Sequence, residues 1–138
     1  MAEGRGVGAT YIEGVVTGPT GERARVRFLV DSGAVYSLLP HDIWRKLELS
    51  PRRIQRFALA DGTGIERAVS GCRIAFPQGE TGDTPVILGE PGDVALLGVV
   101  TLEELGLVLN PFDRTLHPME HLLLHIAAQP RSVSPHAT

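Results

Sequence analysis

Apolar and polar residues alternate along short segments of the chain, and sixteen glycines and ten prolines interrupt these segments at short intervals. Val26, Phe28 and Val30 alternate with Arg25 and Arg27, which is the period of two expected of a strand with one buried face. The segments between the interruptions favour Val, Ile, Leu and Phe over helix formers. The pattern therefore predicts an all-β fold class, mainly strands with one or two short helices.

Turn-rich stretches divide the predicted strands into pairs. In the first hairpin, residues 11–16 and 24–30 flank the turn-rich segment 17–22. In the second, residues 57–60 and 65–69 flank a turn with two glycines, which can adopt the positive φ that such turns need. The remaining expected strands are 72–76 paired with 85–88, a fully buried strand at 94–98, and a last hairpin of 107–109 with 114–116.

The first short helix is expected to begin at Pro40, because proline suits the first helical position. Ile43, Trp44 and Leu47 then fall on one helical face, and the helix ends before Pro51. An aromatic residue on the apolar face of a short helix usually serves packing, so we expect Trp44 in the core.

The second short helix is expected to begin after Thr101, whose hydroxyl can cap it, and to run through Leu105. Glu103 and Glu104 would then lie in its first turn, where the helix dipole favours negative charge. Gly106 would end it.

Length and charge limit the classes of function. A chain of 138 residues with 43% hydrophobic content forms one domain with a sizeable core. Thirteen basic and sixteen acidic side chains are scattered and give a net charge of -3, so we expect no nucleic-acid partner and no binding to an anionic membrane. No segment reaches the roughly 18 apolar residues that span a bilayer, and residues 1–14 lack the apolar core of a signal peptide.

The only cysteine, Cys72, excludes an internal disulfide and fits a reducing compartment. We therefore expect a cytoplasmic protein. Nothing near Cys72 in the sequence would activate it as a nucleophile, so the expected role is a small buried thiol in a strand.

The strongest candidate for chemistry is Asp31, which stands where the apolar segment Phe28-Leu29-Val30 ends in a tight turn with Ser32, Gly33 and Ala34. A strand that ends in such a turn can present a carboxylate rigidly at the floor of a cleft. Asp-Ser-Gly is also ordinary turn chemistry, so this triplet alone leaves both interpretations open.

Two further segments stand in a suggestive order. The segment Asp61-Gly62-Thr63-Gly64 follows the Asp31 turn, and Leu96-Leu97-Gly98 precedes a helical segment. From about Tyr11 to Met119, the order resembles the retropepsin-like aspartic protease family, which includes retroviral proteases and small bacterial relatives. The resemblance implies a retropepsin-like acid protease barrel that forms half of a homodimer.

The resemblance also implies an active site made by two chains. Pepsin-like enzymes carry two Asp-Thr/Ser-Gly loops in one chain, whereas this sequence has one, so the second carboxylate would be Asp31 of a twofold-related copy. The implied reaction is hydrolysis of a peptide or protein substrate by water that the two carboxyls activate, with no metal and no cofactor. The implied roles are acid-base catalysis for Asp31, support for Ser32, Gly33 and Ala34, a flap for Asp61, Gly62, Thr63 and Gly64, and packing under the site for Leu96, Leu97 and Gly98.

Two other hypotheses about the function remain open. The chain could keep the scaffold as a non-catalytic dimerisation or peptide-binding module, because fold does not establish activity. It could also act as half of a heterodimer with another Asp-Ser/Thr-Gly protein. An intact Asp31 favours the enzyme.

The C-terminal region is less informative. His117, His121 and His125 recur every four residues, a spacing that could serve zinc along a helix, but Pro118 interrupts that helix and the same residues fit a strand. We expect no metal there. The predicted division of the chain is a flexible N-terminus at 1–10, a protease domain at 11–119, a dimer-interface strand or helix at 120–128, and a disordered tail at 129–138.

Overall fold

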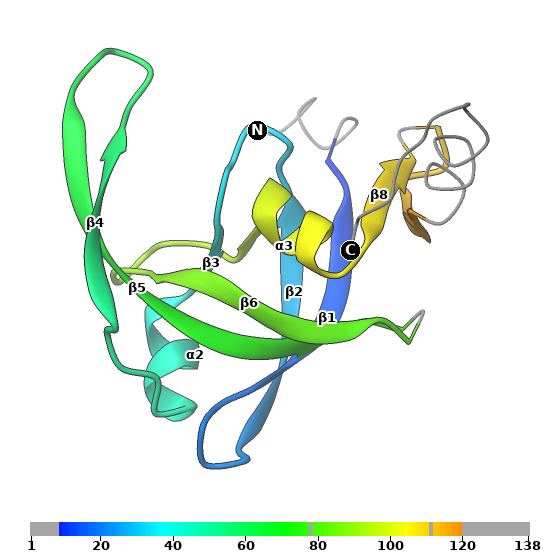
Figure 1. The fold of residues 1–138 in the computed structure, drawn as a ribbon, viewed down its shortest axis with the longest axis horizontal. Helices are drawn as coiled ribbons and strands as arrows, with labels where there is room; N and C mark the ends of the chain where they lie inside the picture. The colour runs from blue at the N-terminus through cyan, green and yellow to red at the C-terminus, as the bar shows by residue number, and fades with distance from the viewer. Residues whose placement is uncertain (1–8, 78, 111, 120–138) are drawn as a thin grey trace, which may run out of the picture.

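The computed structural model describes residues 9–77, 79–110 and 112–119, and in them a barrel-like sheet carries two short helices (Figure 1). The predicted fold class, mainly β with two short helices, is confirmed. The predicted segments 120–128 and 129–138, and almost all of 1–10, lie outside the described residues. The described strands are β1 (Tyr11–Thr17), β2 (Arg23–Val30), β3 (Ser37–Leu39), β4 (Arg53–Ala58), β5 (Gly64–Ala75), β6 (Thr81–Leu88), β7 (Leu96–Leu97), β8 (Leu107–Asn110) and β9 (Thr115–Pro118).

One sheet contains seven strands in the order β1-β2-β7-β3-β6-β5-β4. A further pairing between β1 and β5 joins the first strand of this order to the last but one, so the sheet folds back on itself. Strand β4 pairs only with β5 among the described strands and extends the sheet as an arm. The closed part encloses the core, as expected of a small barrel filled by side chains.

The first hairpin forms as the alternation predicts. Strands β1 and β2 run antiparallel, with Ile12 opposite Phe28 and Val16 opposite Ala24. Val26 and Phe28 are buried while their arginine neighbours are exposed, so one face of β2 lies in the core.

The predicted buried strand at 94–98 is wrong in its extent. Only Leu96 and Leu97 form a strand, β7, and Val94 is 62% exposed. A turn closes just before this strand, where the Asp93 amide donates to the Glu90 carbonyl, so the chain enters the sheet later than its apolar run suggests.

The predicted break between two strands at Ser70 and Gly71 is also wrong. Strand β5 is continuous over twelve residues, and Gly71 pairs with Pro85 inside the ladder with β6. Strand β6 correspondingly begins at Thr81 instead of Pro85, and β4 begins at Arg53 instead of Phe57. Long-range pairing with neighbouring strands overrides the local turn signal of serine and glycine.

Helix α2 (His41–Lys46) forms where predicted, but Pro40 is its N-cap and not its first helical residue. Leu47 is fully buried, and Ile43 and Trp44 pack partly buried against the core. The indole Nε1 of Trp44 also donates a 2.8 Å hydrogen bond to the Gly89 carbonyl, which satisfies its polar atom.

Helix α3 (Val99–Glu104) begins earlier than predicted, and Gly98, not Thr101, is its N-cap. Thr101 lies inside the helix with its side chain buried, and both predicted first-turn acids fall at its end. The amides of Val99 and Val100 donate to the carbonyls of Ala34 and Val35, so the first turn needs no side-chain cap.

The last predicted hairpin forms as β8 and β9, and Leu107 and Leu116 are buried. It makes a separate two-stranded sheet beside the barrel. Its turn holds Phe112, whose side chain is 94% exposed.

Phe28 tests the core directly. It is fully buried, and its ring lies 6.4 Å from that of Phe76. We expect Phe28→Ala to lower the free energy of unfolding by about 3 to 5 kcal/mol, because it removes a buried ring and leaves a cavity. Urea denaturation measures the change. The matched control is Phe112→Ala, which should alter the unfolding free energy by less than about 0.5 kcal/mol; equal effects of the two substitutions would contradict this core.

Candidate active site

Asp31 lies in the loop that follows β2, and both local hydrogen bonds and one to a distant segment fix the shape of this loop. The Asp31 amide donates to the Leu97 carbonyl at 3.1 Å, and the Asp31 carbonyl accepts from the Ala34 amide at 3.0 Å. The carboxylate Oδ1 accepts from the Gly33 amide at 2.9 Å. Asp31 is half-buried, and Ser32 and Gly33 are exposed. The loop therefore holds one carboxylate oxygen in place while keeping the group open to solvent.

The structure brings Leu96, Leu97 and Gly98 directly beneath this loop. Strand β7 lies between β2 and β3, parallel to the first and antiparallel to the second. Leu97 is fully buried. A Cβ added at Gly98 would lie 2.6 Å from the Tyr36 carbonyl oxygen, so the two backbones are in close contact here.

Three buried hydroxyl groups lie below this contact, and the sequence analysis did not identify them as site residues. The Ser37 Oγ accepts from the Gly98 amide at 2.9 Å and lies 2.5 Å from Thr101 Oγ1. Thr101 Oγ1 lies 2.8 Å from Thr84 Oγ1. The available signal was a hydroxyl residue within each of three apolar segments, which also fits ordinary strand or helix composition.

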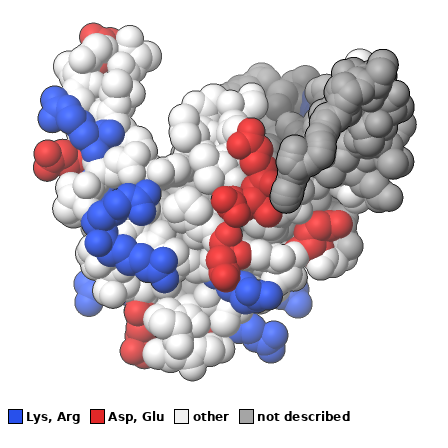
Figure 2. All heavy atoms as spheres, in the orientation of Figure 1, with Lys and Arg blue, Asp and Glu red and all other residues white. Residues whose placement is uncertain are grey.

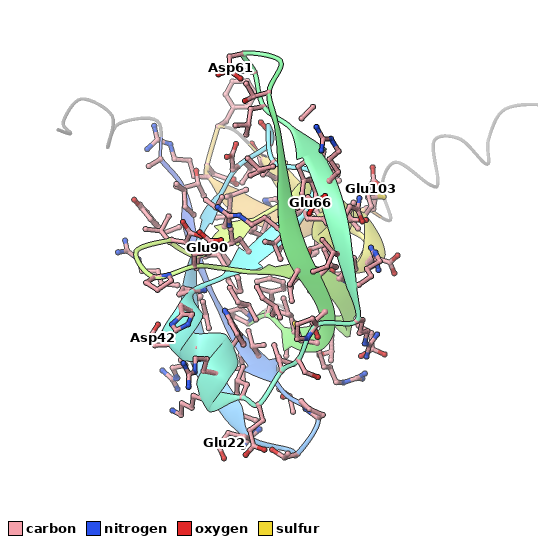
Figure 3. All side chains as sticks on the ribbon, turned by 90° about the vertical axis from the view of Figure 1, so that its left-hand side faces the viewer. Glu22, Asp42, Asp61, Glu66, Glu90 and Glu103 are labelled. Atoms are coloured by element: carbon pink, nitrogen blue, oxygen red, sulfur yellow. The ribbon has the colours of Figure 1, made fainter. Side chains whose placement is uncertain are left out.

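The predicted flap is the tip of the β4–β5 hairpin, and its four residues are exposed. Asp61 lies at its outer end, as Figure 3 shows. The Asp61 Oδ1 accepts from the Thr63 amide at 3.0 Å and from the Thr63 hydroxyl at 2.7 Å, and Gly62 has a φ of 93°. These hydrogen bonds lower the pKa of Asp61 below its ordinary value, so the tip keeps its negative charge into the acid range.

The hairpin tip and the Asp31 loop lie toward the same end of the molecule, but the hairpin stands away from the body (Figures 1 and 2). No hydrogen bond joins the tip to Asp31 in the part of the chain that the structure describes. Tyr36, which follows the loop, instead contacts β4 of the hairpin along its length, from Arg53 to Phe57. Its ring packs edge-on against Phe57 at 5.6 Å, and its hydroxyl accepts from Arg53 Nη2 at 3.1 Å.

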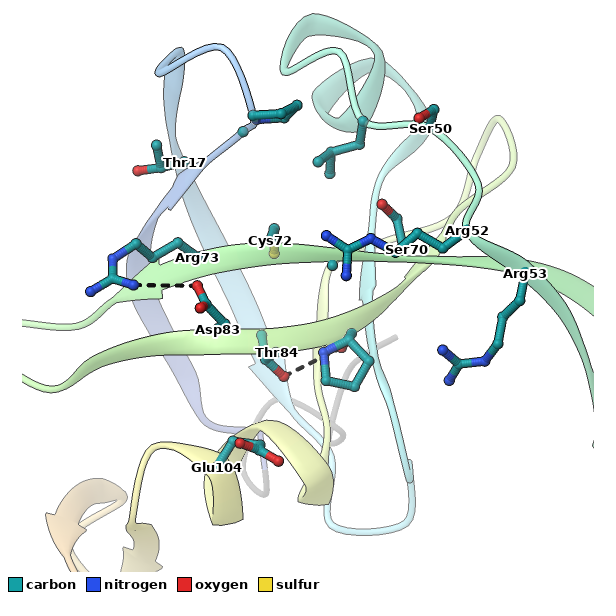
Figure 4. A pocket seen from close by; sticks show the side chains of 15 residues that line it. Thr17, Ser50, Arg52, Arg53, Ser70, Cys72, Arg73, Asp83, Thr84 and Glu104 are labelled. Atoms are coloured by element: carbon teal, nitrogen blue, oxygen red, sulfur yellow. Dashed lines mark hydrogen bonds and ion pairs between the residues drawn. The ribbon is translucent and has the colours of Figure 1, made fainter.

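A separate open groove of about 640 Å³ lies across the middle of β5 and β6 (Figure 4). None of the predicted site residues lines it. Burial raises the pKa of Cys72, which lines the groove, to about 12, so this thiol stays protonated at neutral pH. The buried, inactive thiol expected from sequence is what the structure contains.

Charges of both signs share the face drawn in Figure 2, where a basic patch lies beside an acidic stripe. Of the described helices, none is long and apolar enough to cross a bilayer. Nor do the described residues contain a group of three or more His, Cys, Asp or Glu side chains that could hold a metal ion. His117 Nε2 lies 2.7 Å from Thr115 Oγ1 and 3.3 Å from Asp113 Oδ2, and His121 and His125 lie outside the described residues.

Comparison with known families decides the relationship. The profile of the family described as "gag-polyprotein putative aspartyl protease" matches residues 19–104, which is more than half of the chain. The chain belongs to this family. The matched range of this aspartyl protease family includes the Asp31 loop, the β4–β5 hairpin and β7, and the retropepsin-like resemblance seen in the sequence is confirmed.

The crystal structure of a retropepsin-like aspartic protease from Rickettsia conorii is similar to this aspartyl protease family member, with 22% identity and a TM-score of 0.47. The match covers 75% of this chain and 86% of that one. A search of curated proteins found no match.

The tip of the β4–β5 hairpin offers a test of its electrostatics. We expect Thr63→Val to raise the pKa of Asp61 toward its ordinary value, because the side-chain hydrogen bond that most favours the carboxylate is lost. A lowered pKa means that these bonds stabilise the folded hairpin above the ordinary pKa of the carboxyl, and that this stabilisation is lost as the pH falls through the folded value. Carboxyl-detected NMR titration measures the pKa, and urea denaturation at a series of acid pH values measures the stability.

The β8–β9 turn provides the reciprocal control for that titration. Asp113 accepts hydrogen bonds from the Thr115 hydroxyl and amide, which lower its pKa in the same way. Thr115→Val should therefore raise the pKa of Asp113 and leave that of Asp61 unchanged. A Thr63→Val protein in which the pKa of Asp61 does not move would show that this hydrogen bond is not formed in solution.

Proposed function

We propose that this chain is an aspartic endopeptidase that acts as a homodimer, with Asp31 of each copy supplying one of two catalytic carboxyls. The observation that supports this most directly is the Asp31 loop. It offers a half-buried carboxylate, held at Oδ1 by the Gly33 amide, next to an exposed Ser32. Membership of an aspartyl protease family makes peptide hydrolysis the expected chemistry for such a carboxylate.

The second copy follows from the number of carboxyls that the reaction needs. The sequence contains one Asp-Ser-Gly loop, and one carboxyl cannot both accept a proton from water and donate one to the peptide carbonyl in the same step. A twofold axis beside Asp31 would supply the second group without another loop in the chain. The exposed side of the Asp31 loop is the surface that we assign to this contact, with Ser32, Gly33 and Ala34 as its supports.

Two carboxyls that meet across an axis cannot both be charged at low cost, so the pair shares a proton and titrates as a unit. The ionised carboxyl takes a proton from a bound water molecule, and that water attacks the peptide carbon. The protonated carboxyl donates to the carbonyl oxygen, which gives a tetrahedral intermediate with no covalent bond to the enzyme. As this intermediate collapses, the carboxyl that took a proton from water gives it to the nitrogen, and the other carboxyl takes back the proton that it gave to the oxygen. The carbon–nitrogen bond breaks, and a carboxylic acid and an amine leave.

The substrate that we propose is an extended peptide or protein segment between the Asp31 loops and the hairpin tips. The hairpin contacts Tyr36 through Arg53 and Phe57 of β4 and carries only local hydrogen bonds at its tip, which suits a flap that closes over a bound peptide. Asp61, Gly62, Thr63 and Gly64 would form its closing edge. We assign the domain to residues 11–119 and, from the single cysteine, place the protein in the cytoplasm.

The role of Asp31 is tested by Asp31→Asn, which keeps the shape of the side chain and removes its acid-base function. We expect cleavage of a mixed peptide library, followed by mass spectrometry from acidic to neutral pH, to fall by at least about 100-fold. The control is Asp42→Asn on helix α2, which changes charge equally at an exposed position and should leave cleavage unchanged. Full activity of Asp31→Asn would remove Asp31 from the mechanism, and a wild-type protein that binds peptides without cleaving them would favour the binding module.

The dimer is tested by mixing. If random pairing of subunits makes the site, a threefold excess of Asp31→Asn should leave about a quarter of the activity of the wild-type protein alone. Specific activity should also fall on dilution, in step with dissociation followed by analytical ultracentrifugation. An equal excess of serum albumin is the control for crowding and adsorption. Activity that changes neither with the excess of Asp31→Asn nor with dilution would show that a single chain suffices.

A further inference from the structure

We propose that Ser37 and Thr101 are positioning residues for Asp31 and act through a chain of buried hydroxyl groups under the active-site loop. The inference rests on the proposed function of Asp31. Ser37 on β3 and Thr101 on α3 are 0% exposed, and Thr84 on β6 is 3% exposed. Strand β3 pairs with β7 on one side and with β6 on the other, and α3 follows β7 in the chain.

Within this series of hydroxyl groups, the donor and the acceptor of each hydrogen bond are determined by the two ends. At one end, the Gly98 amide can only donate, and it donates to Ser37 Oγ at 2.9 Å. At the other end, the Pro85 carbonyl can only accept, and Thr84 Oγ1 donates to it at 3.3 Å. Each hydroxyl has one proton to give, so Ser37 donates to Thr101 at 2.5 Å and Thr101 donates to Thr84 at 2.8 Å. All three hydroxyls are then both donors and acceptors, and none is left unpaired.

The chain of hydroxyl groups ends at the peptide group between Leu97 and Gly98, which also holds the Asp31 loop. Gly98 follows Leu97, whose carbonyl accepts from the Asp31 amide at 3.1 Å. It precedes Val99, whose amide donates to the Ala34 carbonyl at 2.9 Å. The Leu97–Gly98 peptide group therefore donates to Ser37 through its nitrogen and accepts from Asp31 through its oxygen. The next amide, that of Val99, holds the other side of the Asp31 turn.

Loss of the Thr101 hydroxyl would act on Asp31 through this route. Ser37 would lose its buried acceptor, and its Oγ would turn toward another partner and weaken the bond from Gly98. A displacement of a few tenths of an ångström at Gly98 would pass to Asp31 through Leu97. Two carboxyls that must meet across an axis tolerate such displacements poorly, because proton transfer needs close and aligned groups.

Burial alone does not account for the three hydroxyls. A buried hydroxyl is stabilising only when its hydrogen bonds are complete, and a matched apolar core can be equally stable without it. Valine has nearly the shape of threonine, so Thr101→Val removes the hydroxyl and keeps the packing. Comparing threonine with valine at position 101 therefore separates the positioning role of the hydroxyl from its contribution to core packing.

The test combines kinetics with amide hydrogen exchange in Thr101→Val. On the peptide that wild type cleaves best, we expect kcat to fall by at least about tenfold and KM to change by less than about twofold, since the loss concerns the reacting groups more than peptide binding. We expect the Asp31 and Gly98 amides to exchange about tenfold faster, with other core amides much less affected. Thr101→Ser restores the hydroxyl and should recover most of both losses. Ser37→Ala provides a second variant in case Thr101→Val fails to fold.

Val16→Ala is the control for general destabilisation, because Val16 is fully buried in β1 and has no part in the hydroxyl chain. Exchange at Asp31 and Gly98 no faster than in Val16→Ala would overturn the proposal. So would a kcat for Thr101→Val equal to that of Val16→Ala. If wild type cleaves no peptide while the selective exchange at Asp31 is seen, the proposed function fails and the positioning of Asp31 by the hydroxyl chain stands.

Discussion

The pairing of β7 with its two neighbours is the constraint on which the rest of the candidate site depends. The chain leaves β2 at Asp31, turns, and returns as β3 on the other side of β7. Both ends of the turn are therefore fixed by two residues, Leu96 and Leu97, that sit between them. A strand this short contributes few hydrogen bonds of its own, so its position depends on burial of Leu97 and on the backbone contacts of Gly98.

The Asp31 loop and the β4–β5 hairpin tip differ in the range of their hydrogen bonds. Below Asp31, hydrogen bonds connect segments far apart in the sequence, such as Ser37 with Thr101. At the hairpin tip, Asp61 bonds only within its own turn among the described residues. The same domain thus pairs a floor fixed by long-range contacts with an arm whose β4 strand contacts Tyr36 and whose tip is free of such contacts among the described residues. Such a division suits a site that must hold reacting groups still and still admit a long substrate.

The sequence predicted those features that depend on local pattern. Alternation in β2 identified a half-buried strand, and the motif at Asp31 identified the loop that the structure places over β7. Local pattern failed at Gly71, where a glycine that resembles a turn pairs within a long ladder, and at Thr101, where the cap of α3 is supplied by the backbone of a distant loop. The strand β3 was missed because three residues carry too little periodicity to read.

The hydroxyl chain lay beyond sequence reasoning for a different reason. Apart from the terminal bond from Thr84 to its neighbour Pro85, its bonded groups are 17 to 64 residues apart, and nothing near Ser37 in the sequence indicates that its partner is Thr101. The arrangement of two Asp31 carboxyls also exceeds what one chain can specify by itself, because it depends on the geometry of a contact between copies. In both cases the missing information is the relative placement of elements, which only the folded chain provides.

The glycines of this fold differ in how much change they would tolerate over evolution. At Gly64 and Gly71, an added Cβ would meet the guanidinium groups of Arg56 and Arg52, which are flexible side-chain ends and can swing aside. At Gly98 the obstacle is the Tyr36 backbone itself, although the φ of -99° at Gly98 would suit any residue. No mutation elsewhere can shorten a carbonyl group, so a larger residue at this position has no simple compensating change. Substitution over evolution should therefore be tolerated at Gly64 and Gly71 and strongly disfavoured at Gly98.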